Sequence, residues 1–238
     1  MSRLELFGID GIPEVRPGDD LAGLIVDAAG SSPTTALAAG DVVVVTQKVV
    51  SKAEGRLVEL DPADPEAKVR LVERESVRIL RRRGELIISE TRHGFVCASA
   101  GVDLSNVDSG WAALLPEEPD RSARRIRDGI RARAGVDVAV VVSDTFGRAW
   151  RVGLTDVAIG CAGIGPIVDL RGEEDATGRP MHVTQVAVVD ELAGAAELVM
   201  GKAAGIPAAV VRGVDPSWLR SGAVGAELVR NPRDDLFR

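Results

Sequence analysis

Two runs of valine constrain the fold of this chain more than any other feature. Residues 138–142 read VAVVV, and residues 41–46 read DVVVVT. Continuous β-branched and apolar runs are typical of strands that are buried on both faces. The hydrophobic content of 45%, carried mainly by Val, Ala, Leu and Gly, suits such a core. The sequence therefore predicts a mixed α/β (α+β) fold, with room in 238 residues for one large domain or two lobes.

A polar stretch follows the run at 138–142. The strand is expected to stop at Ser143-Asp144-Thr145. Gly147 then breaks any regular continuation, and Arg148 and Arg151 follow in the predicted loop. Carboxylate oxygens suit a hard divalent cation, and guanidinium groups suit phosphate or carboxylate. The pattern indicates an anion or metal–phosphate site. The alternative interpretation is that Asp144 and Thr145 only cap the next turn.

Two further stretches carry polar residues next to apolar segments. Residues 47–56, which follow the strand at 41–46, contain two lysines and an arginine. They predict either a segment that contacts phosphate or the solvated start of a charged helix. Residues 93–107 are rich in small side chains, which let a backbone approach a ligand closely, and Asp103 and Asn106 bracket a tight segment there.

Hydrophobic periodicity predicts the remaining elements. Strands are expected over residues 4–7, 85–89 and 206–212, and helices over 21–29 and 121–134. A long helix is expected over 61–83, with three arginines at its C-terminal end as a complement to the helix dipole. A strand that passes into a helix is expected from residue 184 to about residue 204.

Composition argues against several classes of function. A net charge of −7 and an aromatic content of 3% disfavour a nucleic-acid partner. No apolar run approaches a membrane span, and the N-terminus lacks a secretory pattern, so a cytoplasmic protein is expected. Cys97 and Cys161 are isolated and read as buried free thiols. The phosphate-binding pattern GxxxxGK[ST], a strand–helix GxGxxG and the nucleophile pattern GxSxG are all missing.

Four stretches together resemble one family, the coenzyme F420 γ-glutamyl ligases. They are GIPEVRPGDDL at 11–21, VSKAEGR at 50–56, ASAGVDLSNV at 98–107 and SDTFGR at 143–148. Two shorter segments, AIG at 158–160 and GIPAAVVRG at 205–213, are weaker matches. The stretches occur in family order across nearly the whole chain, and the second and third are long and specific.

The resemblance implies an unusual α/β ligase fold without a P-loop that forms an intertwined homodimer. It also implies one ligase domain over residues 1–238, without the C-terminal nitroreductase-like domain to which some relatives are fused. The implied reaction adds L-glutamate to the F420 precursor through an acyl phosphate, with GTP as co-substrate. Mg²⁺ or Mn²⁺ would be the divalent cation, and K⁺ is a further candidate ion.

The resemblance also assigns roles to residues of this sequence. Asp103, Asp144 and Arg148 would be catalytic. The guanidinium groups of Arg148 and Arg151 suit phosphate and carboxylate, so either arginine could hold the acidic substrate. Asp103 and Asp144 would hold one divalent cation, and Thr145 would help to hold a second. Nucleotide contacts are implied at Ile12, Pro13, Glu14, Val15, Gln47, Lys48, Lys52, Asn106, Met200, Gly201, Gly205 and Ile206.

Two positions depart from the family pattern. Lys202 aligns with a site that can carry an acidic metal ligand in the family, and a lysine cannot bind a cation. Gln47 and Lys48 replace small hydroxyl residues found in some relatives. Two other function classes remain open. One is a different metal-dependent small-molecule phosphotransferase, and the other is a binding or scaffold protein that has lost catalysis, to which only the Lys202 departure points.

Overall fold

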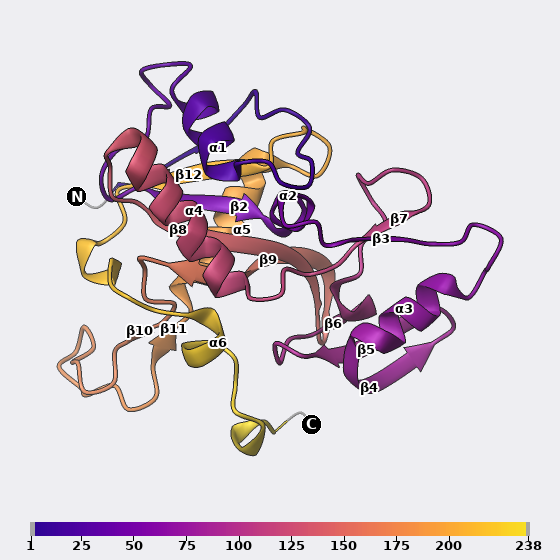
Figure 1. Ribbon diagram of the computed structural model, residues 1–238. Helices are drawn as coiled ribbons and strands as arrows, with labels where there is room; N and C mark the ends of the chain where they lie inside the picture. The colour runs from indigo at the N-terminus through magenta and orange to yellow at the C-terminus, as the bar shows by residue number, and fades with distance from the viewer. Residues whose placement is uncertain (1–2, 237–238) are drawn as a thin grey trace.

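A computed structural model describes residues 3–236 and confirms the mixed α/β class (Figure 1). Its centre is a five-stranded sheet in the order β1-β12-β2-β8-β9. These strands are β1 (Glu5–Gly8), β12 (Ala208–Arg212), β2 (Val42–Thr46), β8 (Ala139–Arg148) and β9 (Arg151–Ala162). Only β2 and β8 pair in parallel, and the other neighbours are antiparallel.

The two valine runs form the middle of this sheet. Val42–Val45 pair in register with residues 139–142, and all eight residues are buried. Helix α4 (Pro119–Ala134) lies in front of the sheet in Figure 1 and α5 (Val188–Met200) lies behind it. Helix α1 (Leu21–Ala29) packs against α4. Helices therefore cover both faces, as continuous apolar strands require.

A second part of the chain has its own small sheets and its own apolar cluster. Strands β4 (Ser76–Arg83), β5 (Leu86–Thr91) and β6 (Val96–Ala98) form one sheet, and β3 (Leu57–Glu59) pairs with β7 (Trp111–Ala113). Helix α3 (Ala67–Glu75) packs beside them. The buried residues of this cluster are Leu71, Val72, Ile87, Ala100, Val102, Ala112 and Leu114.

The remaining elements are short. Helix α2 (Gln47–Ala53) follows β2, the pair β10 (Val168–Asp169) and β11 (Gln185–Val186) precedes α5, and α6 (Val224–Glu227) lies near the C-terminus. Single 3₁₀ turns cover Ser99–Gly101, Pro216–Trp218 and Pro232–Asp234. Among the described helices, none has both the length and the apolar character needed to cross a membrane.

The prediction of a helix over residues 61–83 is wrong at both ends, because the helix of the structure covers only Ala67–Glu75. Helix α3 begins at Ala67, and the chain turns into strand β4 at Ser76, whose hydroxyl lies 2.6 Å from the carbonyl oxygen of Val72. Arg83 pairs with Leu86, so Gly84 (φ 58°) and Glu85 form a two-residue hairpin turn. The three arginines at 81–83 thus lie on a strand, not at a helix terminus.

The loop predicted after residue 142 is also wrong. Strand β8 continues through Ser143, Asp144 and Gly147 to Arg148, because β9 runs back beside it as a long antiparallel hairpin. A register shift between Val142 and Ser143 marks a bulge in this ladder. Smaller corrections are that α5 ends at Met200, not near residue 204, and that the last strand begins at Ala208.

We predict that Gly160 on β9 is required for packing. A Cβ at this position would lie 2.3 Å from the carbonyl carbon of Pro119, at the start of α4. Gly160→Ala should therefore lower the free energy of unfolding by about 1–3 kcal/mol, the range for overpacking. The matched control is Gly147→Ala on β8, where the nearest atom would be 4.0 Å away. Urea unfolding measures both, and equal stabilities for the two variants would contradict the prediction.

Candidate active site

Helix α2 begins where β2 ends, and its polar residues are turned inward. The side-chain amide of Gln47 donates to the Ser51 hydroxyl (2.6 Å) and to the Leu114 carbonyl oxygen (3.0 Å). Lys52 on the same helix is only 7% exposed. The segment at 47–56 thus forms a short helix that ends at Ala53, and its residues Gln47, Ser51 and Lys52 are buried, not solvated.

The buried Lys52 joins α2 to the loop between β1 and α1. Its ammonium group forms an ion pair with the carboxylate of Glu14, which is itself exposed. Val15 is buried in the main core, and Ile12 packs against that core. The structure therefore brings two groups of predicted nucleotide contacts together, residues 12–15 and Lys52.

Asp103 is held beside the other lysine of α2. Its carboxylate accepts hydrogen bonds from the backbone N–H (2.7 Å) and hydroxyl (2.8 Å) of Ser105. The Lys48 ammonium lies 3.0 Å from the second oxygen. Burial alone would raise the pKa of Asp103, but these hydrogen bonds and the Lys48 charge outweigh it and lower the pKa.

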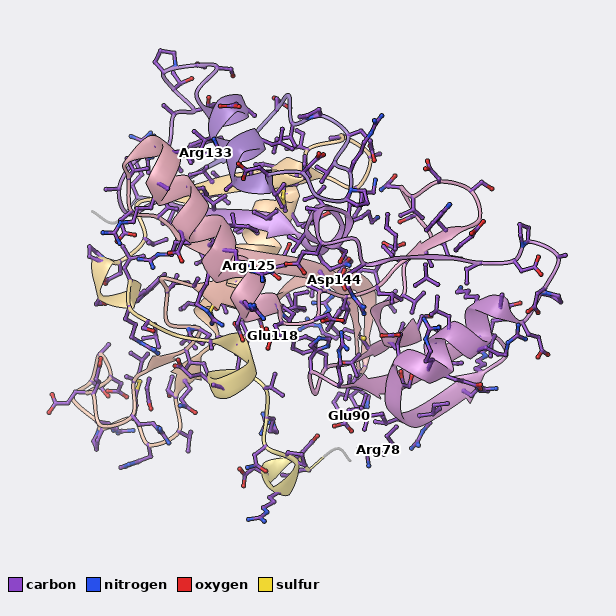
Figure 2. All side chains as sticks on the ribbon, viewed as in Figure 1. Arg78, Glu90, Glu118, Arg125, Arg133 and Asp144 are labelled. Carbon is purple, nitrogen blue, oxygen red and sulfur yellow. The ribbon has the colours of Figure 1, made fainter. Side chains whose placement is uncertain are left out.

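Asp144 lies on β8, where the main sheet meets the part of the chain that carries β6 (Figure 2). Burial, together with the negative charges of Asp103 and Asp156, raises the pKa of Asp144 to about 7. The hydrogen bond from the Thr145 N–H (2.8 Å) opposes this shift only in part. Asp144 is therefore a carboxylate with too little positive charge around it.

The pair Asp103 and Asp144 suits one divalent cation. Their charges interact, and a cation between them would relieve the repulsion that raises the pKa of Asp144. No cluster of three or more His, Cys, Asp or Glu that could hold a metal occurs among residues 3–236. The protein would thus supply two carboxylates, and water or phosphate oxygens would complete the coordination, as is usual for Mg²⁺.

A second polar cluster lies on the β8–β9 hairpin. Thr145 and Lys202 were singled out from the sequence, but Asp156, to which both side chains bond, was missed. Thr145 pairs with Asp156, and its hydroxyl donates to the Asp156 carboxylate (2.6 Å). Ser143 donates to the other oxygen of Asp156 (3.1 Å), and the Lys202 ammonium contacts both Thr145 and Asp156. One signal was available: Asp156 is the only charged residue between 153 and 168.

The structure does not place Arg148 near the two aspartates of its own chain. It lies four residues after Asp144 on β8, roughly 13 Å further along an extended strand. Both Arg148 and Arg151 are exposed at the end of the hairpin. A role for either arginine beside Asp144 in the same chain therefore finds no support in this arrangement.

The other predicted nucleotide contacts lie on two loops. Met200 is buried at the end of α5, and Gly201 (φ 61°) and Gly205 (φ 72°) turn the chain back toward β12. Ile206 packs against the main core. Asn106 is exposed in the loop that follows Asp103, in the left-handed conformation (φ 54°) that asparagine tolerates.

We predict that Asp144 destabilises the metal-free protein at neutral and alkaline pH. Its carboxyl stays protonated up to about pH 7 in the folded chain but ionises near 3.8 when unfolded. The folded state therefore holds the extra proton, and stability falls as the pH rises between these values. In EDTA, Asp144→Asn should be more stable than the natural protein at pH 8, by at most about 4 kcal/mol for the full shift and by less because the side chain keeps some contact with water.

The measurement is urea unfolding at pH 4.5 and pH 8. The stability difference between Asp144→Asn and the natural protein should be small at the lower pH and larger at the higher one. Asp128→Asn, at an exposed aspartate on α4, is the control and should show no such dependence. A difference for Asp144→Asn that stays constant with pH would contradict the assignment.

Known proteins of one family resemble this chain along nearly its whole length. Residues 10–213 match the family model described as F420-0:gamma-glutamyl ligase. The coenzyme F420:L-glutamate ligase of Methanothermobacter thermautotrophicus is 43% identical over 250 aligned positions that cover 99% of both chains. The enzymes of the same name from Methanopyrus kandleri and Haloarcula marismortui are 44% and 40% identical, and the alignments cover 100% and 99% of this chain and 100% and 96% of the relatives. The chain therefore belongs to the F420-0:gamma-glutamyl ligase family.

Proposed function

We propose that this chain is a coenzyme F420:L-glutamate ligase that joins L-glutamate to the F420 precursor with GTP as co-substrate. Relatives that carry the ligase name match it from end to end. The observation that carries the proposal is the pair Asp103 and Asp144, in which burial and mutual repulsion raise the pKa of Asp144 to about 7. Such a pair is suited to a cation that accompanies nucleotide phosphates.

Asp103 and Asp144 would hold Mg²⁺ or Mn²⁺. When bound, the cation would neutralise charge on the transferred phosphoryl group. Lys48, which bonds to Asp103, would be free to turn toward phosphate once a cation took over that carboxylate. The residues of this chain therefore supply positive charge around the phosphates without a P-loop.

The nucleotide would lie between α2 and the two loops at 12–15 and 200–206. Lys52 joins α2 to the first of these loops through Glu14. Asn106 is exposed on the loop after Asp103, and the glycines at 201 and 205 leave the backbone of the second loop accessible. Because Lys52 is buried, we expect its replacement to affect the fold as well as nucleotide binding.

The proposed reaction has two steps and needs no protein nucleophile. A carboxylate oxygen of the F420 precursor attacks the γ-phosphorus of GTP, which yields an acyl phosphate and GDP. The amino nitrogen of glutamate then attacks the acyl carbon, the C–O bond to phosphate breaks, and an amide and inorganic phosphate result. Cys97 is no nucleophile, because burial and the negative charge of Asp144 raise the pKa of its thiol to about 12.

We also propose that the exposed end of the β8–β9 hairpin mediates a homodimer. Trp150, Val152 and Leu154 are 84%, 100% and 67% exposed there. Apolar side chains gathered at one place on a surface mark an interaction site. In such a dimer Arg148 would serve the substrate site of the partner chain, which accounts for its distance from Asp144 in its own chain.

The direct test is to incubate the protein with the F420 precursor, L-glutamate, a divalent cation and either GTP or ATP, and to read the product mass. The expected product is the precursor plus one or more glutamyl residues, formed with GTP far faster than with ATP. Phosphorylated precursor without incorporated glutamate would instead show a phosphotransferase. Equal rates with both nucleotides would contradict the assignment of GTP.

Three variants connect this activity to the site. Asp103→Asn and Asp144→Asn each keep the side-chain shape, and each should abolish both product formation and cation binding. The double variant should be no worse than either single one, because both changes remove the same ion. Asp128→Asn is the matched control and should retain activity. Undiminished cation affinity in either single variant would show that the two aspartates do not share a cation.

A further inference from the structure

The cluster around Lys202 has the composition of a cation site, but a side chain of the protein already fills it. The Lys202 ammonium nitrogen lies 2.9 Å from the Asp156 carboxylate and 3.5 Å from that of Glu197, and it contacts the Thr145 hydroxyl. Two carboxylates and a hydroxyl are oxygen ligands that a hard divalent cation takes. An ammonium group has three N–H donors and meets the same three oxygens.

The buried carboxylate of Asp156 needs a positively charged partner. Its side chain is only 2% exposed, and a buried carboxylate is costly without a charge partner. Ser143 and Thr145 donate hydrogen bonds to it, but both are neutral. Within the described part of the chain, Lys202 is the only cationic side chain that forms an ion pair with Asp156.

The cluster also lies directly beside the proposed cation site. Asp156 pairs across the hairpin with Thr145, which is next to Asp144, and the Asp156 charge contributes to the raised pKa of Asp144. Lys202 belongs to the loop after α5, which we assign to the nucleotide. A charge placed here would act on the same phosphates as a cation held by Asp103 and Asp144.

We propose that the ammonium group of Lys202 takes the place of a second divalent cation, so that each chain binds one such ion. This proposal rests on the proposed function for the first ion only. Thr145, for which the family resemblance implied a second cation, does not fit that role here, because an ammonium group and a metal ion cannot share its hydroxyl and the Asp156 carboxylate. The enzyme carries its second positive charge as part of its own chain.

The test is the number of Mn²⁺ ions bound per chain, measured by calorimetric titration with Mn²⁺ alone and checked by the electron paramagnetic resonance of free Mn²⁺. The natural protein should bind one ion. Lys202→Met removes the ammonium group and should bind one more, and Lys202→Gln should do the same if the first variant folds poorly. The additional ion should disappear when Asp156→Asn is combined with either variant.

Two controls distinguish the effect of removing the Lys202 charge from a general disturbance of the structure. Lys202→Arg retains the positive charge and should bind the same number of ions as the natural protein. Lys68→Met makes the same chemical change on α3, outside the candidate site, and should also leave the number unchanged. Mn²⁺ should raise the melting temperature of Lys202→Met more than that of Lys68→Met.

The outcomes distinguish this proposal from the function that it builds on. Two ions on the natural protein, or no additional ion on the Lys202→Met and Lys202→Gln variants, would overturn the role of Lys202. No ion on the natural protein but one on Lys202→Met would support that role and contradict the cation at Asp103 and Asp144. One ion on the natural protein and two on Lys202→Met would support both.

Discussion

The parallel pairing of β2 with β8 is the constraint on which the rest of the structure depends. Each strand contributes four buried residues to the pair, and the register sets Thr46 beside Ser143. Because the strands run in the same direction, both end at one edge of the sheet. The start of α2, with Gln47 and Lys48, is therefore fixed next to Asp144. Apolar burial, the main stabilising term in folding, thus also positions the polar groups of the site.

Charge balance at that edge distinguishes the acidic residues from one another. Lys48 pairs with Asp103, and Lys202 pairs with Asp156, whereas within residues 3–236 no lysine or arginine forms an ion pair with Asp144. The Lys48 charge lowers the pKa of Asp144, but burial and the two neighbouring carboxylates outweigh it. The raised pKa of Asp144 is the consequence. We interpret this imbalance as the reason why the site would bind one divalent cation between Asp103 and Asp144.

Local patterns were sufficient to predict the centre of the fold. The valine runs gave both central strands, and apolar periodicity gave α1 at residues 21–29 as observed. The hydrophobic periodicity that predicts a helix through residues 76–83 is misleading, because these residues form strand β4. The β-branched side chains of Val77 and Ile79 and the Gly84-Glu85 turn instead support a strand in a hairpin.

The candidate site could be predicted only in part, and the reason is physical. Asp103, Asp144 and Lys52 were recognised because each lies next to an apolar or small-residue segment. The contacts of Asp156 depend on the register of a bulged hairpin and on a lysine 46 positions away, and neither is visible in a local pattern. Gln47 is a residue for which the resemblance implies a nucleotide contact. In the structure its side-chain amide donates hydrogen bonds to Ser51 and to the carbonyl oxygen of Leu114.

The central claim is that the positive charges of the protein do not balance the negative charge of the Asp144 carboxylate, and that this carboxylate therefore binds a divalent cation. Its pKa can be measured directly from the carboxyl ¹³C chemical shift in protein labelled with ¹³C-aspartate, with the resonance assigned by its loss in Asp144→Asn. The account predicts a midpoint near pH 7 in EDTA, and a clear fall in that midpoint when Mg²⁺ is added. A midpoint near 4 that Mg²⁺ does not change would contradict it.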